Sequence, residues 1–76
     1  MTREEEVKNI MVSFRTLKGL TIDDAAKKIG VSYATYQKYE SKPYTMPMEV
    51  FDKLVNLFGQ DFAKVFFEEK LYRMYS

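Results

Sequence analysis

Apolar residues spaced three and four positions apart fill most of the chain, and three glycines interrupt this pattern. Such spacing gives a helix one apolar face, here called a stripe. A glycine just beyond the stripe commonly ends the helix. The first stripe predicts a helix from about Arg3 to Leu17, which Gly19 closes. Its inward residues would be Val7, Ile10, Met11, Phe14, Leu17 and Leu20. We therefore expect an all-α fold, a compact bundle of four to five helices.

The length and composition limit the chemistry available to this chain. With 76 residues, of which 46% are hydrophobic, we expect a single domain over residues 1–76 with a small core. The absence of cysteine and histidine removes disulfides, thiolate nucleophiles, sulfur-bound zinc and the commonest general base. We therefore expect no enzyme activity, no catalytic residues, no metal site and no cofactor.

The beginning of the chain and its hydropathy predict a cytoplasmic protein. The first eight residues, MTREEEVK, are acidic and lack the basic and then apolar run of a secretory signal. No stretch approaches the roughly 18 uncharged apolar residues that a membrane span needs. We therefore expect no membrane partner.

Two short helices are predicted in the middle of the sequence. Thr21 and Asp24 form a T-x-x-D capping pattern, in which the hydroxyl accepts from a free amide and the carboxylate sits at the positive end of the helix dipole. This second helix should stop at Gly30, because glycine readily adopts the left-handed conformation of a tight turn. Ser32 can cap a third helix, from there to about Glu40.

The third helix should have one face for packing and one free face. Tyr36 and Tyr39 lie together on the packing face. The other face carries Tyr33, Ala34, Gln37, Lys38 and Ser41.

Small residues at Ala25 and Ala26 suit a close crossing of the second and third helices. Two helices joined by so short a turn form a helix-turn-helix, whose second helix can enter the major groove of DNA.

The C-terminal half predicts a loop from Ser41 to Met46 and two further helices. The inward residues of the fourth helix, before Gly59, would be Met48, Phe51, Leu54, Val55 and Phe58. The fifth helix should span about Asp61 to Met74 and close the core with Phe62, Val65 and Phe66. It also carries a second apolar stripe of Phe67, Leu71, Met74 and Tyr75. That stripe predicts either the seam of a homodimer or a tail that folds back over the core.

The segment from Leu20 to Glu40, LTIDDAAKKIGVSYATYQKYE, resembles the Cro and phage-repressor family of helix-turn-helix domains, also called XRE-like. The likeness rests on several spaced features, which makes it far more specific than one short motif. They are Thr21, Ala26, the Ile29-Gly30-Val31-Ser32 turn, Tyr36, Tyr39, Glu40 and the later Leu57 to Gly59. The resemblance implies a lambda-repressor-like bundle and a sequence-specific regulator, a small repressor or Cro-like protein that binds operator DNA as a dimer.

The resemblance also implies which residues would face DNA. The base-contacting residues would be Tyr33, Ala34, Gln37 and Lys38. An amide such as that of Gln37 could pair with adenine, and the ammonium of Lys38 could donate to guanine. Phosphate contacts are expected from Arg15, Lys27, Lys28, Ser32, Thr35 and Lys42. The alternative for each lysine is a solvated surface charge.

The distribution of charge favours a phosphate-facing surface in the middle of the chain. The net charge is only +1, but residues 8–42 are basic whereas the two flanks together are acidic. The positive residues of this stretch are Lys8, Arg15, Lys18, Lys27, Lys28, Lys38 and Lys42, and the negative ones are Asp23, Asp24 and Glu40.

Two departures from the family pattern keep a second hypothesis open. Ile22 stands where many relatives have glutamine, and the adjacent Asp23 and Asp24 would repel phosphate unless they only complement the helix dipole. The Asn-Gly that follows the third helix in relatives is replaced by Ser41-Lys42-Pro43. The second hypothesis is a helix-turn-helix module that binds a protein partner through a tyrosine-rich surface around Tyr33 and Tyr44.

Overall fold

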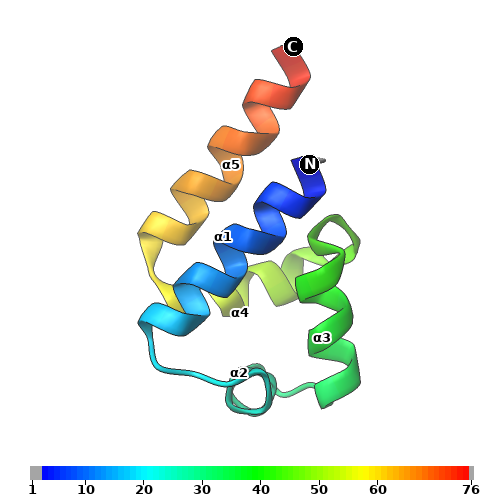
Figure 1. Cartoon of the computed structure of the whole chain (residues 1–76), viewed down its shortest axis with the longest axis vertical. Helices are drawn as coiled ribbons and strands as arrows, with labels where there is room; N and C mark the ends of the chain where they lie inside the picture. Colours follow the sequence, from blue (N-terminus) through cyan, green and yellow to red (C-terminus); the bar gives the residue numbers. More distant parts are fainter. Residues whose placement is uncertain (1–2, 76) are drawn as a thin grey trace.

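The computed structural model describes the backbone of residues 3–75 and the side chains of residues 4–68. Within this range the chain forms five α-helices, one short 3-10 helix and no strand, which confirms the all-α prediction (Figure 1). The elements are α1 (Arg3–Leu17), α2 (Ile22–Ile29), α3 (Tyr33–Ser41), η1 (Pro43–Thr45), α4 (Met48–Phe58) and α5 (Gln60–Tyr75). No helix in residues 3–75 combines the length and the apolarity required to span a bilayer.

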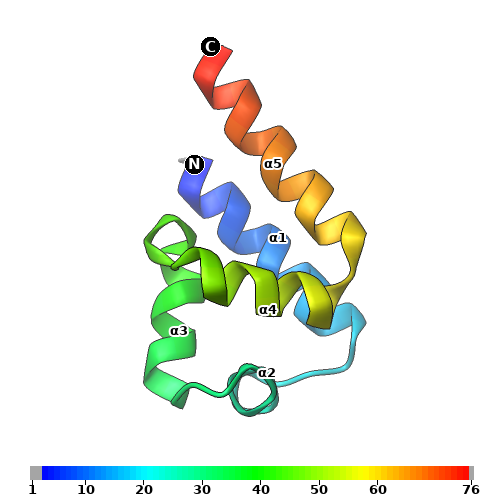
Figure 2. The same ribbon diagram turned by 180° about the vertical axis from the view of Figure 1, so that it is seen from behind.

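The helices pack around α1 in a body of 36 × 22 × 22 Å. Figures 1 and 2 show α5 running beside α1, with α4 crossing below them and α3 on the side opposite to the beginning of α5. The short α2 lies at one end of the molecule and contacts both α3 and α4. This arrangement leaves the outer faces of α2 and α3 uncovered.

One buried cluster joins all five α-helices. Phe62 of α5 lies at its centre, with no exposed area and with ring centroids 5.2–5.8 Å from the rings of Phe14, Phe51, Phe58 and Phe66. The buried residues are Val7, Met11, Ala25, Ala26, Ile29, Tyr36, Val50, Phe51, Leu54, Phe58, Phe62 and Phe66. Burial of this apolar area and the aromatic contacts stabilise the bundle, and α2 and α3 are fixed to it through their inner faces.

Two predicted inward positions, both at helix ends, are exposed, and Val65, which was predicted to close the core, is half-buried outside the core cluster. Leu17, the last residue of α1, is 81% exposed, because the chain turns away there and the half-buried Leu20 packs against the core instead. Met48, the first residue of α4, is 65% exposed. The buried stripe of α4 passes through Val50, Phe51, Leu54 and Phe58, and Met48 lies roughly a quarter turn from it.

Candidate nucleic-acid interface

The turn between α2 and α3 is built from local hydrogen bonds. Thr21 and Asp24 form the predicted capping box, with 3.1 Å between each side-chain oxygen and the other residue's backbone nitrogen. Gly30 adopts the left-handed conformation, with φ of 76°, and the Val31 amide donates to the Ala26 carbonyl at 3.0 Å. Ser32 then caps α3 by accepting from the Thr35 amide at 3.1 Å. Short-range interactions therefore fix the angle at which α3 begins.

No described part of the protein covers the outward face of α3. Tyr33, Ala34, Gln37 and Lys38 are exposed, as the helical pattern predicts, while Tyr36 is fully buried. Ser32 is exposed and its hydroxyl donates to the Thr35 hydroxyl at 2.9 Å. The residues predicted to contact bases thus share one accessible surface.

The charged residues predicted to contact phosphate fall into two groups, while Thr35, also predicted to do so, is half-buried. Lys27, Lys28 and Lys42 are exposed on α2 and just after α3. Arg15 lies apart from them, because only 14% of its side chain is exposed and its guanidinium is already bonded within the protein. The three lysines are exposed on the α2–α3 unit, whereas the guanidinium of Arg15 is bonded to Glu40 at the C-terminal end of α3.

Arg15 and Glu40 form an ion pair that the sequence did not suggest. The Nε and Nη2 atoms of Arg15 donate to the two carboxylate oxygens of Glu40 at 3.0 and 3.1 Å, and Nη1 donates to the Leu20 carbonyl at 2.9 Å. The Glu40 side chain is only 6% exposed. One side chain of α1 therefore holds both the turn before α2 and the C-terminal end of α3. One signal in the sequence could have indicated this ion pair. Glu40 follows the inward Tyr36 by four residues and so shares its face of the helix, and a carboxylate on a buried face requires a charged or hydrogen-bonding partner.

Tyr36 lies beside this ion pair. Its hydroxyl is buried without a hydrogen-bond partner among the described residues. Burial disfavours the phenolate and raises the pKa of Tyr36 well above its ordinary value, and the negative charge of Glu40 raises it further. Tyr36 is therefore neutral at any physiological pH and serves the packing of α3.

A family profile described as Helix-turn-helix matches residues 13–65, from the second half of α1 into α5. The chain belongs to the XRE-type helix-turn-helix family. It is similar to a protein of Pyrobaculum aerophilum named as a candidate HTH-type transcriptional regulatory protein, with 34% identity over 50 residues. The match spans 66% of this chain and 20% of the length of that relative. No solved structure matches the chain.

The structure explains the departures from the XRE-type pattern at the start of α2. Ile22 is half-buried and packs against the core. Asp24 belongs to the capping box, and its hydrogen bonds with Thr21 lower the pKa of its carboxyl group. Asp23 instead pairs with Lys27 at 3.0 Å. Both aspartates remain exposed on α2, and Asp23 lines the same depression as Tyr33 of α3, so its negative charge is part of the candidate interface.

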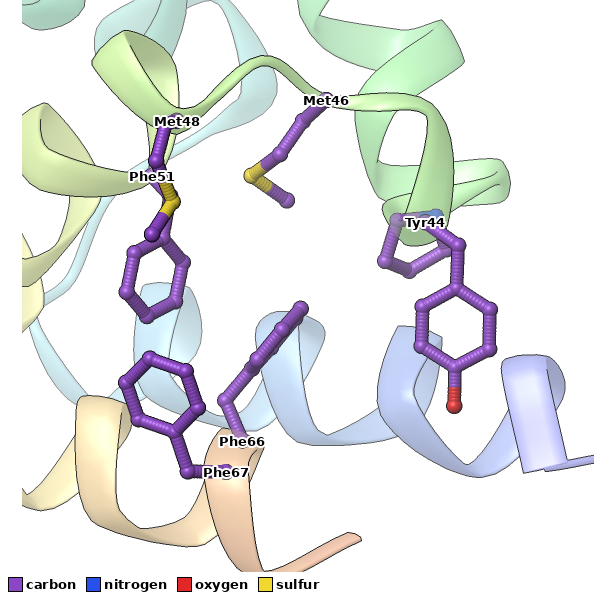
Figure 3. Close-up of a pocket in the computed structure, with 7 residues that line it drawn as sticks. Tyr44, Met46, Met48, Phe51, Phe66 and Phe67 are labelled. Carbon is purple, nitrogen blue, oxygen red and sulfur yellow. The ribbon is translucent and has the colours of Figure 1, made fainter. Parts of the chain in front are cut away.

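A small apolar pocket lies away from this interface, between η1, α4 and α5 (Figure 3). Its volume is about 50 Å³. The lining residues are Pro43, Tyr44, Met46, Met48, Phe51, Phe66 and Phe67. Met48 and Phe67 are 65% and 43% exposed and leave an apolar patch at its rim. Of the residues predicted for a dimer seam, Phe67 belongs to this patch, whereas the side chains of Leu71, Met74 and Tyr75 lie outside the described residues.

The expected tyrosine-rich surface is wrong. Tyr33 is half exposed at the first turn of α3, but Tyr44 follows the other end of that helix. The Tyr44 ring packs edge-on against Phe66 with 6.4 Å between centroids, and its hydroxyl is buried. The two tyrosines therefore do not share a surface, because the length of α3 separates them.

Proposed function

We propose that the chain acts as one DNA-binding domain, a small repressor that reads an operator through α3. In this proposal Gln37 and Lys38 pair with base edges, Ala34 contacts a thymine methyl group, and Tyr33 contacts the sugar or phosphate. Ser32, Thr35, Lys27, Lys28 and Lys42 bind phosphates on either side of the groove. Bound protein represses transcription by blocking access to the promoter.

The observation that supports this proposal best is the uncovered face of α3. A recognition helix must present several polar side chains together, on a convex element that fits a groove about 12 Å wide. Tyr33, Ala34, Gln37 and Lys38 are all exposed on α3, and α3 is held from behind by Arg15 through Glu40. Membership of a helix-turn-helix family supports the same assignment. Arg15 is left out of the phosphate set because its guanidinium is bonded to Glu40 and Leu20.

Selection of duplexes from a random pool, followed by titration at several salt concentrations, tests the proposal. We expect an enriched sequence, and an affinity for it that falls steeply as salt rises, because each phosphate contact releases counterions. No enriched sequence, or binding that does not change with salt, would contradict operator recognition. Binding to a protein partner without any DNA binding would support the protein-interaction module instead.

We further propose that the functional unit is a homodimer, with α5 and the rim of the apolar pocket at its seam. A single recognition helix covers only one half-site, and dimers reach two half-sites about 34 Å apart. Met48 and Phe67 are exposed beside the pocket, and a seam would remove this apolar area from water. The sequence continues the stripe of Phe67 with Leu71, Met74 and Tyr75 on α5.

Replacing Phe67 by serine is expected to weaken this dimer at least tenfold, because truncating a large apolar side chain that anchors an interface costs about 2 kcal/mol or more. Sedimentation equilibrium over a range of concentrations measures the dissociation constant. The matched control is Leu17→Ser, since Leu17 is also an exposed apolar residue but lies at the end of α1. Equal dissociation constants for the two variants would place the seam elsewhere.

A further inference from the structure

Asp23 and Lys27 form an ion pair on the exposed surface of α2. The Oδ2 atom of Asp23 lies 3.0 Å from Nζ of Lys27, one helical turn away. The two side chains are 53% and 74% exposed, so a ligand could reach either of them. The attraction of Asp23 also raises the pKa of Lys27, and the lysine stays charged at neutral pH. Asp23 therefore competes with any anion that approaches Lys27.

The carboxylates of Asp23 and the neighbouring Asp24 have different partners. The carboxylate of Asp24 accepts a hydrogen bond from the Thr21 backbone, and its amide donates to the Thr21 hydroxyl, which begins α2. Asp23 makes no such cap, and its carboxylate pairs with the Lys27 ammonium. Both carboxylates lie in the first turn of α2, where they complement the helix dipole, but only Asp24 is also tied into the cap.

The position of Asp23 places it at the edge of the candidate interface. Asp23 and Tyr33 line the same shallow depression, between the beginning of α2 and the first turn of α3. The exposed charges of the α2–α3 unit are Lys27, Lys28, Lys38, Lys42, Asp23 and Asp24. Because so few positive charges are present, occupation of one lysine by a carboxylate removes a large share of the attraction for phosphate.

We propose that Asp23 is an affinity-limiting residue, which lowers the attraction of the protein for DNA phosphate by holding Lys27 in an ion pair. This inference rests on the proposed DNA-binding function. On binding, a DNA phosphate would have to displace the carboxylate from Lys27 and would also lie close to its negative charge. This cost applies to operator and random DNA alike. It lowers the non-specific affinity that phosphate contacts provide, so that stable binding requires the additional contacts to bases.

The test compares Asp23→Asn with the wild-type chain on the selected operator and on a random duplex. We expect Asp23→Asn to bind both about fivefold more tightly at low salt, which corresponds to one charge interaction near 4 Å in water. The slope of log affinity against log salt should change by much less than about 0.9, the value for one whole phosphate contact, because Lys27 contacts phosphate in both proteins. The result is a gain of binding, which a misfolded variant could not produce.

Asp61→Asn is the matched control, because Asp61 is also an exposed aspartate in the first turn of a helix. It lies at the start of α5, on the side of the molecule opposite to α3 (Figure 1). A gain for Asp61→Asn equal to that for Asp23→Asn would overturn the proposal, since net charge alone would then explain it.

Lys27→Ala and the double variant Asp23→Asn with Lys27→Ala complete the cycle. We expect the gain from Asp23→Asn to disappear when Lys27 is absent. A gain that persists without Lys27 would overturn the ion-pair explanation. If the wild-type chain and all variants fail to bind any duplex, the proposed function fails, whereas operator binding with no gain for Asp23→Asn contradicts this inference alone.

Discussion

Replacing Glu40 by alanine is expected to destabilise the protein by about 3–5 kcal/mol, because the guanidinium of Arg15 would stay in a nearly buried position without its partner. The total stability of a chain of this size is on the order of 4–11 kcal/mol, so much of it would be lost. Thermal unfolding followed by circular dichroism should show a midpoint lower by at least 12 °C, at about 4 °C for each kcal/mol.

Two controls separate the buried pair from surface ion pairs. Glu49→Ala removes an ion pair with Lys53, in which the Glu49 side chain is 82% exposed and the atoms are 3.7 Å apart. It should cost less than about 1 kcal/mol. The double variant Arg15→Met with Glu40→Leu should recover much of the stability, because an apolar pair leaves no uncompensated charge. A cost for Glu40→Ala as small as that for Glu49→Ala would contradict the buried role of the pair.

Reversing the charge of Lys38 is expected to cost about 30-fold in operator affinity, since Lys38→Glu replaces an attraction to DNA by a repulsion of similar size. Lys38 is exposed on the outward face of α3, and its replacement disturbs no buried contact. Fluorescence anisotropy with the selected duplex measures the change, and the unfolding midpoint should stay within a few degrees of wild type.

Lys64→Glu provides the matched charge reversal, because Lys64 is exposed on α5 and lies outside the α2–α3 unit. We expect only a small loss of affinity, and this loss should vanish at high salt as distant charges are screened. If both reversals have the same effect, α3 is not the element that lies closest to DNA.

Local patterns predicted most of the fold. The capping box of Thr21 and Asp24 joins residues three positions apart, and the left-handed turn needs only Gly30, so both could be read from short segments. The same holds for the outward face of α3, which follows from helical periodicity. Leu17 and Met48 were wrongly predicted to be buried. At the end of a helix the apolar pattern continues in one direction only, so it does not show whether the last residue still faces the core.

Contacts between distant parts of the chain could not be predicted in this way. Arg15 was predicted to bind phosphate because it is one of the positive residues in the basic middle of the chain, but its partner Glu40 lies 25 residues away and on another helix. The separation of Tyr33 from Tyr44 likewise depends on where the chain goes after α3. The two aspartates of α2 are adjacent in sequence, and only the structure distinguished the cap of Asp24 from the lysine contact of Asp23.

The three hydrogen bonds of Arg15 have a consequence for the thermodynamics of recognition. They fix α3 against the remainder of the bundle before any ligand arrives. Docking onto a duplex would then proceed as a rigid-body event, with little conformational entropy lost by the protein backbone. The heat capacity change on complex formation should accordingly reflect the contact area alone, without the larger decrease that accompanies coupled folding.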